Sequence, residues 1–153
     1  MRWLLPVLAL LLSGCGFYLQ GSLPSGAVLP VFTVSGLADT HPLVQELEQQ
    51  SANYRQDAQQ TRRLHISRAQ WQQRVISHAQ DGTPVEYELR LELRVQVQDQ
   101  DGQLRAEYPL SVYGDYSFSP ALILSKGVEE ARLRDDLVQR AATNILRRLA
   151  YQQ

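Results

Sequence analysis

Residues 85–98 alternate between apolar and polar side chains without a break. The odd-numbered positions are apolar and the even-numbered ones polar: Val85, Tyr87, Leu89, Leu91, Leu93, Val95 and Val97 against Glu86, Glu88, Arg90, Glu92, Arg94, Gln96 and Gln98. Strict period two is the pattern of a β-strand with one face in a core and the other in water. Most strands have about five or six residues, so this strand is long and its neighbours must be long as well.

Asp-Gly pairs stand on both sides of this strand and predict two hairpins. They occupy positions 81–82 and 101–102, and Asp-Gly between alternating segments is a strong hairpin signal. The strand after the second turn, residues 104–118, keeps period two with apolar even-numbered positions. Pro109 falls on the opposite parity and cannot donate a ladder hydrogen bond, which indicates an edge strand or an outward position.

The strand before the first turn changes parity part-way along. Its apolar residues are first even-numbered and then odd-numbered: Leu64 and Ile66, followed by Ala69, Trp71 and Val75. A change of parity turns the side chains to the other face unless the strand accommodates an extra residue. We therefore expect a β-bulge near Ser67 and Arg68. Residues 55–63, which are polar and rich in glutamine, predict a loop.

Two segments have the spacing of amphipathic helices. Pro42 suits the first position of a helix, and Leu43, Leu47 and Tyr54 follow on one face of about three to four turns. The second helix begins near Gly127 and continues through the last residues of the sequence, and residues 121–126 before it predict a connecting turn or a short helical piece. Its apolar residues recur every three or four positions: Val128, Ala131, Leu137, Val138, Ala141, Ala142, Ile145, Leu146 and Leu149.

Residues 28–35 are dense in apolar and β-branched side chains and predict one more strand. The order of elements is then β-α-β-β-β-α. Each helix has an apolar stripe and each hairpin strand an apolar face, so a two-layer α+β sandwich buries them all. We expect a four-stranded, mostly antiparallel sheet with two helices packed on one face. The first strand is expected to run parallel to another strand through a right-handed crossover.

The first residues predict a lipoprotein signal peptide. A short charged start is followed by an apolar run over residues 3–12, which is too short for the roughly 20 residues of a membrane-spanning helix. Small residues then precede Cys15, an arrangement that resembles the lipobox of bacterial lipoproteins. In this interpretation residues 1–14 are the signal peptide, 15–27 the lipid anchor and tether, and 28–153 a single domain.

Cys15 is the only cysteine of the chain, so it has no intramolecular disulfide partner. The lipobox resemblance implies a diacylglycerol on its thiol and an acyl group on its new amino terminus, which would hold the chain on a membrane. Gly16 follows it, not an aspartate that would resemble an inner-membrane retention signal, so we expect an outer-membrane anchor facing the periplasm. The alternatives are a buried cysteine or cleavage elsewhere.

Charge and motifs exclude several classes of function. The chain has 15 Lys plus Arg and 16 Asp plus Glu, so no basic tract indicates nucleic acid. The histidines lie in separate predicted elements at positions 41, 65 and 78, without metal-ligand spacing. No nucleophile elbow, phosphate-binding loop or dinucleotide fingerprint is present. We therefore expect no catalytic residues, no metal and no cofactor apart from the lipids on Cys15.

Four arginines share the outward parity of neighbouring strands and predict a patch for anionic groups. They are Arg74, Arg90, Arg94 and Arg105. The alternative is that glutamates on the same strands neutralise them in cross-strand pairs. These glutamates are Glu86, Glu88, Glu92 and Glu107.

Several motifs in order resemble the LptE family of Gram-negative outer membranes. They are Cys15-Gly16-Phe17-Tyr18-Leu19, Val85-Glu86-Tyr87-Glu88-Leu89 after Gly82, Tyr108-Pro109, Ser117-Phe118, and the closing Ala141 with Ile145-Leu146-Arg147-Arg148-Leu149. The sequence departs from the family in a short segment between the first helix and second strand, and in lacking the long polar tail of some members.

The resemblance implies a non-catalytic lipoprotein that plugs the large LptD β-barrel, assists its assembly and helps insert lipopolysaccharide into the outer leaflet. In that family basic residues near loop ends are the proposed lipopolysaccharide contacts, and Lys126, just before the last helix, matches such a position. Our hypothesis is that Lys126, together with Arg90 and Arg94, contacts the phosphates of lipid A. Gln80 stands in the hairpin turn where a cation would be expected, which weakens a contact there. The alternatives are a lipoprotein scaffold of another envelope-assembly complex and a small periplasmic hydrolase, which the missing catalytic residues disfavour.

Overall fold

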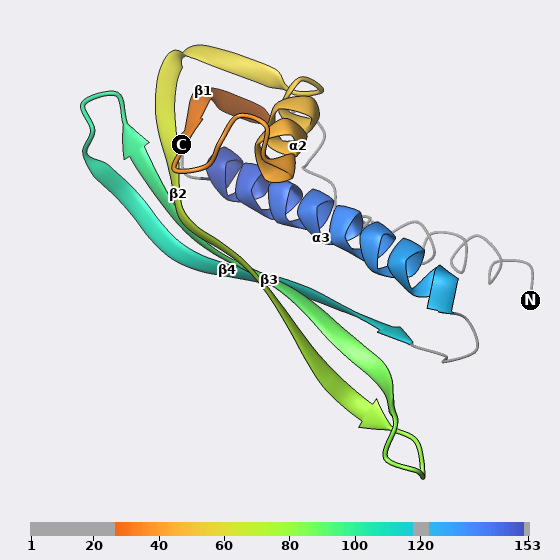
Figure 1. The fold of residues 1–153 in the computed structure, drawn as a ribbon. Coiled ribbons are helices and arrows are strands. Elements are labelled where there is room, and N and C mark those ends of the chain that lie inside the picture. Colours follow the sequence, from red (N-terminus) through yellow and green to blue (C-terminus); the bar gives the residue numbers. More distant parts are fainter. Residues whose placement is uncertain (1–26, 118–122, 152–153) are drawn as a thin grey trace, which may run out of the picture.

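The computed structural model describes residues 27–117 and 123–151, with side chains in the second segment from Gly127 onward. A four-stranded sheet has the spatial order β1-β2-β3-β4, and two helices cover one of its faces (Figure 1). The strands are β1 (Val28–Ser35), β2 (Arg55–His78), β3 (Pro84–Asp99) and β4 (Leu104–Ser117), and the helices are α2 (Pro42–Ser51) and α3 (Ile123–Tyr151). β1 is parallel to β2 and the other neighbours are antiparallel. The predicted fold class is confirmed.

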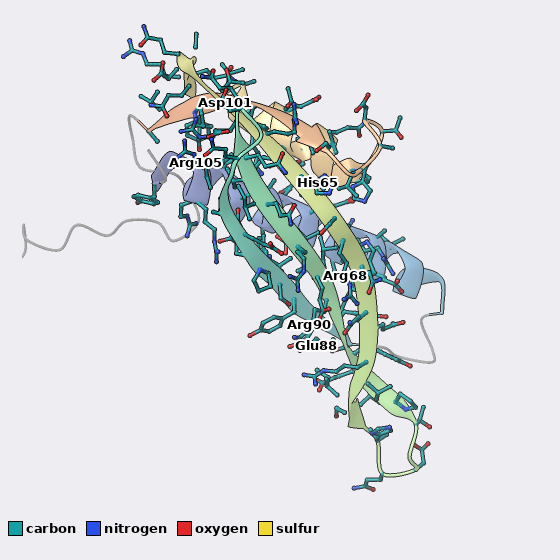
Figure 2. The ribbon with its side chains drawn as sticks, turned by 90° about the vertical axis from the view of Figure 1, so that its left-hand side faces the viewer. His65, Arg68, Glu88, Arg90, Asp101 and Arg105 are labelled. Carbon is teal, nitrogen blue, oxygen red and sulfur yellow. The ribbon has the colours of Figure 1, made fainter. Side chains whose placement is uncertain are left out.

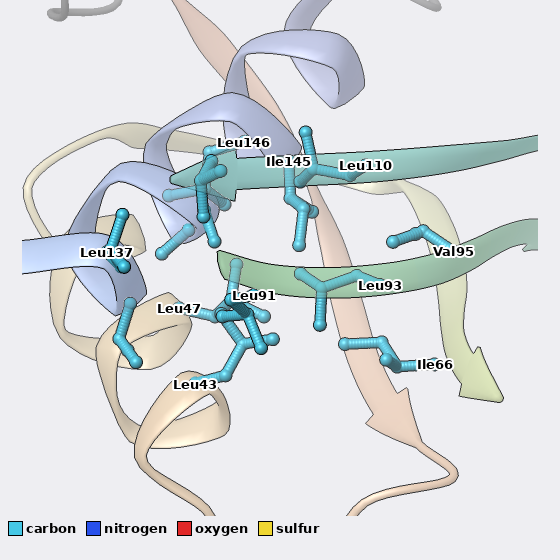
Figure 3. Close-up of a cluster of buried hydrophobic side chains, with 14 of the residues drawn as sticks. Leu43, Leu47, Ile66, Leu91, Leu93, Val95, Leu110, Leu137, Ile145 and Leu146 are labelled. Atoms are coloured by element: carbon cyan, nitrogen blue, oxygen red, sulfur yellow. The ribbon is translucent and has the colours of Figure 1, made fainter. Parts of the chain in front are cut away.

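The core lies between the apolar face of the sheet and the two helices (Figure 3). In β3 the odd-numbered side chains from Leu89 to Val97 are at most 3% exposed, as the alternation predicts. From the helices, Leu43 and Leu47 of α2 and Ile145 of α3 are fully buried against them. Burying a side chain of this size stabilises the fold by roughly 1.5–3 kcal/mol. Burial of the regularly spaced apolar side chains of β3, α2 and α3 therefore stabilises the packing of the helices on the sheet.

Both predicted hairpin turns are confirmed. Gly82 and Gly102 have φ angles of 82° and 78°, in the left-handed region that glycine adopts without a steric penalty. In the second turn the Asp99 carboxylate accepts the backbone N–H groups of Asp101 and Gln103 at 3.0 and 2.9 Å. β4 follows this turn as an edge strand, which confirms the interpretation of Pro109.

The helix boundaries differ from the prediction. Pro42 does begin α2, and the ring Nδ1 of His41 caps it by accepting the backbone N–H of Leu43 at 3.2 Å. The helix ends at Ser51, so Tyr54 lies beyond it. α3 begins at Ile123, four residues before the predicted start. A short apolar run such as the one at its start is ambiguous from periodicity alone.

Residues 55–63 form the first part of β2 and not a loop, so that prediction is wrong. Their backbone pairs with β1, beginning with Arg55 opposite Val28. Most side chains here are exposed, so the segment has no apolar alternation by which a strand is detected. The backbone hydrogen bonds to β1 make it a strand.

The predicted bulge is confirmed by a register shift between Ile66 and Arg68, where β2 pairs with β3. A second shift, between Val75 and Ser77, was not predicted. It leaves the Ile76 side chain 42% exposed near the end of the hairpin. No helix in the described part of the chain is long and apolar enough to cross a membrane.

Candidate functional site

The sheet face that points away from the helices carries the candidate binding residues. Arg90 and Arg94 alternate with the buried leucines of β3, so they project from this face, as predicted. Figure 2 shows Arg90 there beside Glu88. Because the neighbouring strands are in register, polar side chains of β2 and β4 lie beside them. We call this surface the polar face; it consists of Arg68, Gln70, Gln72 and Arg74 of β2, Glu88, Arg90, Glu92 and Arg94 of β3, and Glu107, Ser111 and Tyr113 of β4.

Glu88 is the centre of a charged cluster near the β2–β3 hairpin. It is only 6% exposed, and its Oε1 lies 2.9 Å from both Arg74 Nε and Arg90 Nη2. Burial favours the neutral acid, but hydrogen bonds and charges from Arg74 and Arg90 outweigh it and hold the pKa of Glu88 below its usual value of 4.5. The cluster therefore keeps an ionised carboxylate between two guanidinium groups and has one excess positive charge.

A shallow hollow of about 200 Å³ adjoins this cluster and is lined by Gln72, Gln73, Arg74, Glu88 and Arg90. The guanidinium of Arg90 also lies 5.3 Å from the ring centre of Tyr113, so two neighbours, Glu88 and Tyr113, fix its position. Guanidinium N–H groups that face solvent bind carboxylate or phosphate bidentately. The arrangement suits the binding of an anionic group beside Glu88.

Arg94 lies farther along the polar face and forms an ion pair with Glu107, with Nη1 2.9 Å from Oε1. Directly opposite Arg94 on β2 is Arg68, which donates to Gln70. Among the described residues no carboxylate pairs with Arg68, and like charges facing each other across strands are unfavourable. The sequence did not indicate Arg68 as a site residue because the bulge obscures which face it occupies.

The alternative of neutralising glutamates is confirmed for two of the four. Glu88 and Glu107 pair with arginines, whereas Glu92 accepts a hydrogen bond from Gln72 at 3.1 Å. The prediction that Arg105 belongs to this face is wrong, because it lies at a register shift and binds Asp99 at the β3–β4 turn, 2.7 Å between Nη2 and Oδ2.

The other predicted site residues are less defined. The backbone of Lys126 is in the first turns of α3, on the helix that covers the opposite face from Arg90 and Arg94, and its side chain lies outside the described part. Cys15 lies outside the described residues as well. Neither a shared contact of Lys126 with the two arginines nor lipidation of Cys15 is tested by the structure, and both remain predictions.

A polar and aromatic network attaches the first half of α3 to the sheet. Tyr116 stacks on Tyr87, with ring centres 5.5 Å apart, and its hydroxyl accepts a hydrogen bond from Gln73 and donates one to Glu130 at 3.4 Å. Burial and the nearby Glu130 carboxylate raise the pKa of Tyr116. Glu130 in turn pairs with Arg134 at 2.8 Å, and Arg134 lies 4.8 Å from the ring centre of Trp71.

The described histidines have structural roles or stand apart. His41 caps α2, and His65 Nδ1 lies 3.2 Å from the hydroxyl of Ser35. Within residues 27–117 and 127–151 no three His, Cys, Asp or Glu side chains are grouped so that they could hold a metal ion. What the geometry provides is a polar sheet face on which guanidinium groups border a shallow hollow.

A comparison with models of known protein families identifies the family of the chain. The family model LptE, described as lipopolysaccharide-assembly, matches residues 30–149, which include all described elements except the ends of β1 and α3. The chain belongs to the LptE family. A curated relative, "LPS-assembly lipoprotein LptE" of Pectobacterium atrosepticum, is 28% identical over 92% of this chain and 79% of its own length.

Solved structures of low identity share the LptE fold of this chain. A rare lipoprotein B from Shewanella oneidensis aligns with a TM-score of 0.65 at 19% identity, over 80% of this chain and 93% of the other. Lipoprotein B from Nitrosomonas europaea aligns with a TM-score of 0.63 at 21% identity, covering 89% and 91%. A minor lipoprotein from Acinetobacter baumannii gives 0.62 at 17%, covering 82% and 92%.

Proposed function

We propose that the chain is a non-catalytic subunit of the lipopolysaccharide transport machinery, anchored in the outer membrane by lipids on Cys15. In this proposal it sits inside the large β-barrel LptD, supports the assembly of that barrel and aids insertion of lipopolysaccharide into the outer leaflet. Membership of the LptE family supports the role in lipopolysaccharide assembly, and the similar Pectobacterium protein is named for it.

The polar face is the observation that carries the barrel proposal. One side of the sheet is closed by the helices, while the other presents charged and amide side chains along the lengths of β2 and β3. Interiors of large membrane barrels are polar, so the polar side chains of this face can contact polar groups on the inner wall of a barrel. The ion pairs of Glu88 and Glu107 keep its net charge low.

Purification of the tagged, lipidated protein from outer membranes in mild detergent tests this role. We expect a large barrel to co-purify in near-stoichiometric amount, with mass spectrometry identifying it as the lipopolysaccharide exporter. A Cys15→Ala variant is the control for the anchor, because it should lose the acyl mass. Recovery of the wild type alone, or with a different assembly machine, would contradict the proposal and support the alternative of a scaffold for another envelope complex.

Direct contact with lipopolysaccharide is a second part of the proposal. Arg90 is positioned by Glu88 and Tyr113 and faces the hollow, where its free N–H groups suit a phosphate of lipid A. Arg94 and Lys126 complete the proposed set. Replacing all three with glutamine should weaken lipopolysaccharide binding and flatten its dependence on salt. Unchanged binding and unchanged salt dependence would exclude this set.

A further inference from the structure

The described arginines fall into two groups that occupy different parts of the molecule. Those with a carboxylate partner are Arg74, Arg90, Arg94, Arg105, Arg134 and Arg140. The others form no ion pair with a described carboxylate, and they are Arg55, Arg62, Arg63, Arg68, Arg132, Arg147 and Arg148. The paired group extends along the sheet and α3, whereas most of the second group lies at one end.

The strand register and the course of α3 bring these unpaired arginines together. Arg55 pairs with the first residue of β1, and Arg62 lies opposite Asp99 at the end of β3. Figure 1 shows the carboxyl end of α3 beside the same end of the sheet. We define the basic end by residues of β2 and of the last turns of α3: Arg55, Arg62, Arg63, Arg147 and Arg148.

Neither α3 arginine of the basic end forms an ion pair with a described carboxylate. The guanidinium of Arg148 lies 4.2 Å from the ring centre of Tyr108, a cation–π contact that leaves its N–H groups free for an anion. Nε of Arg147 and the hydroxyl of Tyr108 are buried without a hydrogen-bond partner in the described part of the chain. Buried polar atoms without hydrogen-bond partners are rare, and this end of the described chain has two of them.

The opposite end of the molecule carries acidic residues. The first half of α3 contains Glu129, Glu130, Asp135 and Asp136, of which Glu130 and Asp136 are paired with arginines. The β2–β3 turn adds Asp81, whose pKa is lowered by the backbone N–H of Thr83. The basic end also contains Asp57, Asp99 and Asp101, of which Asp99 pairs with Arg105. Its five arginines without ion pairs outnumber the two remaining carboxylates, so an anionic surface would attract this end more strongly than the opposite one.

The first described strand begins at the basic end. β1 begins at Val28 beside Arg55, so the segment from Cys15 enters the fold there. A segment of this length reaches roughly 45 Å when fully extended. The anchor alone would therefore hold the domain near the membrane without fixing its orientation, and this step rests on the lipidated Cys15 of the proposed function.

We propose that the basic end is a membrane-docking surface that binds anionic phospholipid headgroups in the leaflet holding the acyl chains. Guanidinium groups bind phosphate bidentately, and each arginine close to an anionic membrane strengthens binding roughly fivefold. A cation near the carboxyl end of a helix interacts favourably with the helix dipole, which accounts for Arg148. Arg55, Arg62 and Arg63 lie on a strand, so the helix dipole does not account for them. What the five arginines share is their position at the end of the molecule where β1 begins.

Orientation is measured with the lipidated mature chain in vesicles. Cys15 is the only native cysteine, and acylation blocks it, so Gln103→Cys at the basic end or Gln80→Cys at the far turn accepts a single fluorescent donor. The acceptor is attached to lipid headgroups. With phosphatidylglycerol in phosphatidylcholine vesicles we expect energy transfer from position 103 to exceed transfer from position 80, and high salt to abolish the difference. Equal transfer from both positions in these vesicles would overturn the proposal.

A matched pair of double variants separates the basic end from general charge. The test variant carries Arg63→Gln and Arg148→Gln, and the control carries Arg68→Gln and Arg132→Gln; all four arginines are exposed and unpaired in the described structure. In the non-acylated full mature chain, with Cys15→Ser, the test variant should bind phosphatidylglycerol vesicles roughly 25-fold more weakly. The control should lose less than about fivefold. Equal losses would overturn the proposal, and circular dichroism verifies that each variant is folded.

The outcomes also separate this proposal from the function proposed above. No barrel is present in the vesicle assays, so docking can be confirmed even if LptD does not co-purify. If the test variant binds anionic vesicles as well as the wild type but no longer co-purifies with the barrel, the basic end is a protein-binding surface and the membrane proposal is wrong. If the purified native chain lacks acyl mass, the anchor proposal fails, and the non-acylated assay still decides whether the basic end binds headgroups.

Discussion

The two ends of β3 have the same alternation of apolar and polar residues, but only one end is covered. Toward Asp99, Leu91, Leu93 and Val95 are at most 3% exposed under both helices. Toward Pro84, Tyr87 is only partly buried, and Val75, opposite it on β2, is 39% exposed. The hairpin extends past the helices at this end (Figure 1). Alternation therefore predicts a strand and its apolar face, whereas the positions of α2 and α3 decide how much of that face is a core.

The largest effect is expected from the covered end. Leu91→Ala removes a side chain that is 1% exposed in the middle of the core, and such truncations cost about 2–5 kcal/mol because they leave a cavity. The measurement is urea denaturation followed by circular dichroism. Val75→Ala, at the uncovered end of the same sheet, is the control and should cost less than about 1 kcal/mol. Equal losses would show that the hairpin is as well packed as the core.

The contact between β4 and α3 gives the next largest effect. A Cβ atom at Gly114 would lie 2.8 Å from Cδ1 of Leu133, so Gly114→Ala should displace the end of that side chain and cost about 1 kcal/mol in the free energy of unfolding. In a double variant, Leu133→Ala removes the obstructing atom, so the two changes together should cost less than the sum of the single ones. Strict additivity would contradict a direct clash.

Acid should weaken the polar face through Glu88. Its pKa in the folded chain is below the usual 4.5, so its ion pairs contribute stability above that pH and lose it as the pH falls through the lowered pKa. Urea midpoints measured from neutral pH to pH about 3 should show this loss in the wild type. Glu88→Gln should lower the urea midpoint at neutral pH by less than Leu91→Ala or Gly114→Ala does. It should also make the midpoint fall less steeply as the pH is lowered. An identical fall in both proteins would mean that other carboxylates account for it.

The sequence predicts most of the helices and strands because buried positions in them carry apolar side chains and exposed positions carry polar ones. β3, β4 and both helices show this pattern, and the same parity correctly placed Arg90 and Arg94 on one face. Residues 55–63 were missed because their backbone pairs with β1 while their side chains stay in solvent. Parity also cannot identify the partner of a charge: Arg105 binds Asp99 across a turn, at a position shifted by a bulge.

The basic end shows the same limit from another direction. Arg55, Arg63 and Arg148 are far apart in the sequence and have no common pattern, and a dipeptide such as Arg147-Arg148 on a helix is compatible with an ordinary solvated surface. Only the register of β2 with β1 and β3, together with the path of α3, places them at one end. The lack of an ion pair between these arginines and any described carboxylate is likewise a property of the folded chain.

The smallest effect on stability is expected at the tip of the uncovered hairpin. Ile76 lies at the second register shift of β2 and is 42% exposed, so Ile76→Ser should change the free energy of unfolding by no more than about 0.5 kcal/mol, as for other surface positions. Urea denaturation measures this, with Ile66→Ser, at a fully buried position of the same strand, as the destabilised reference. A loss of more than about 1 kcal/mol at Ile76 would mean that the tip is packed in the isolated chain. A neutral result would leave its apolar side chain, exposed at the tip of the hairpin, free for contacts outside the domain.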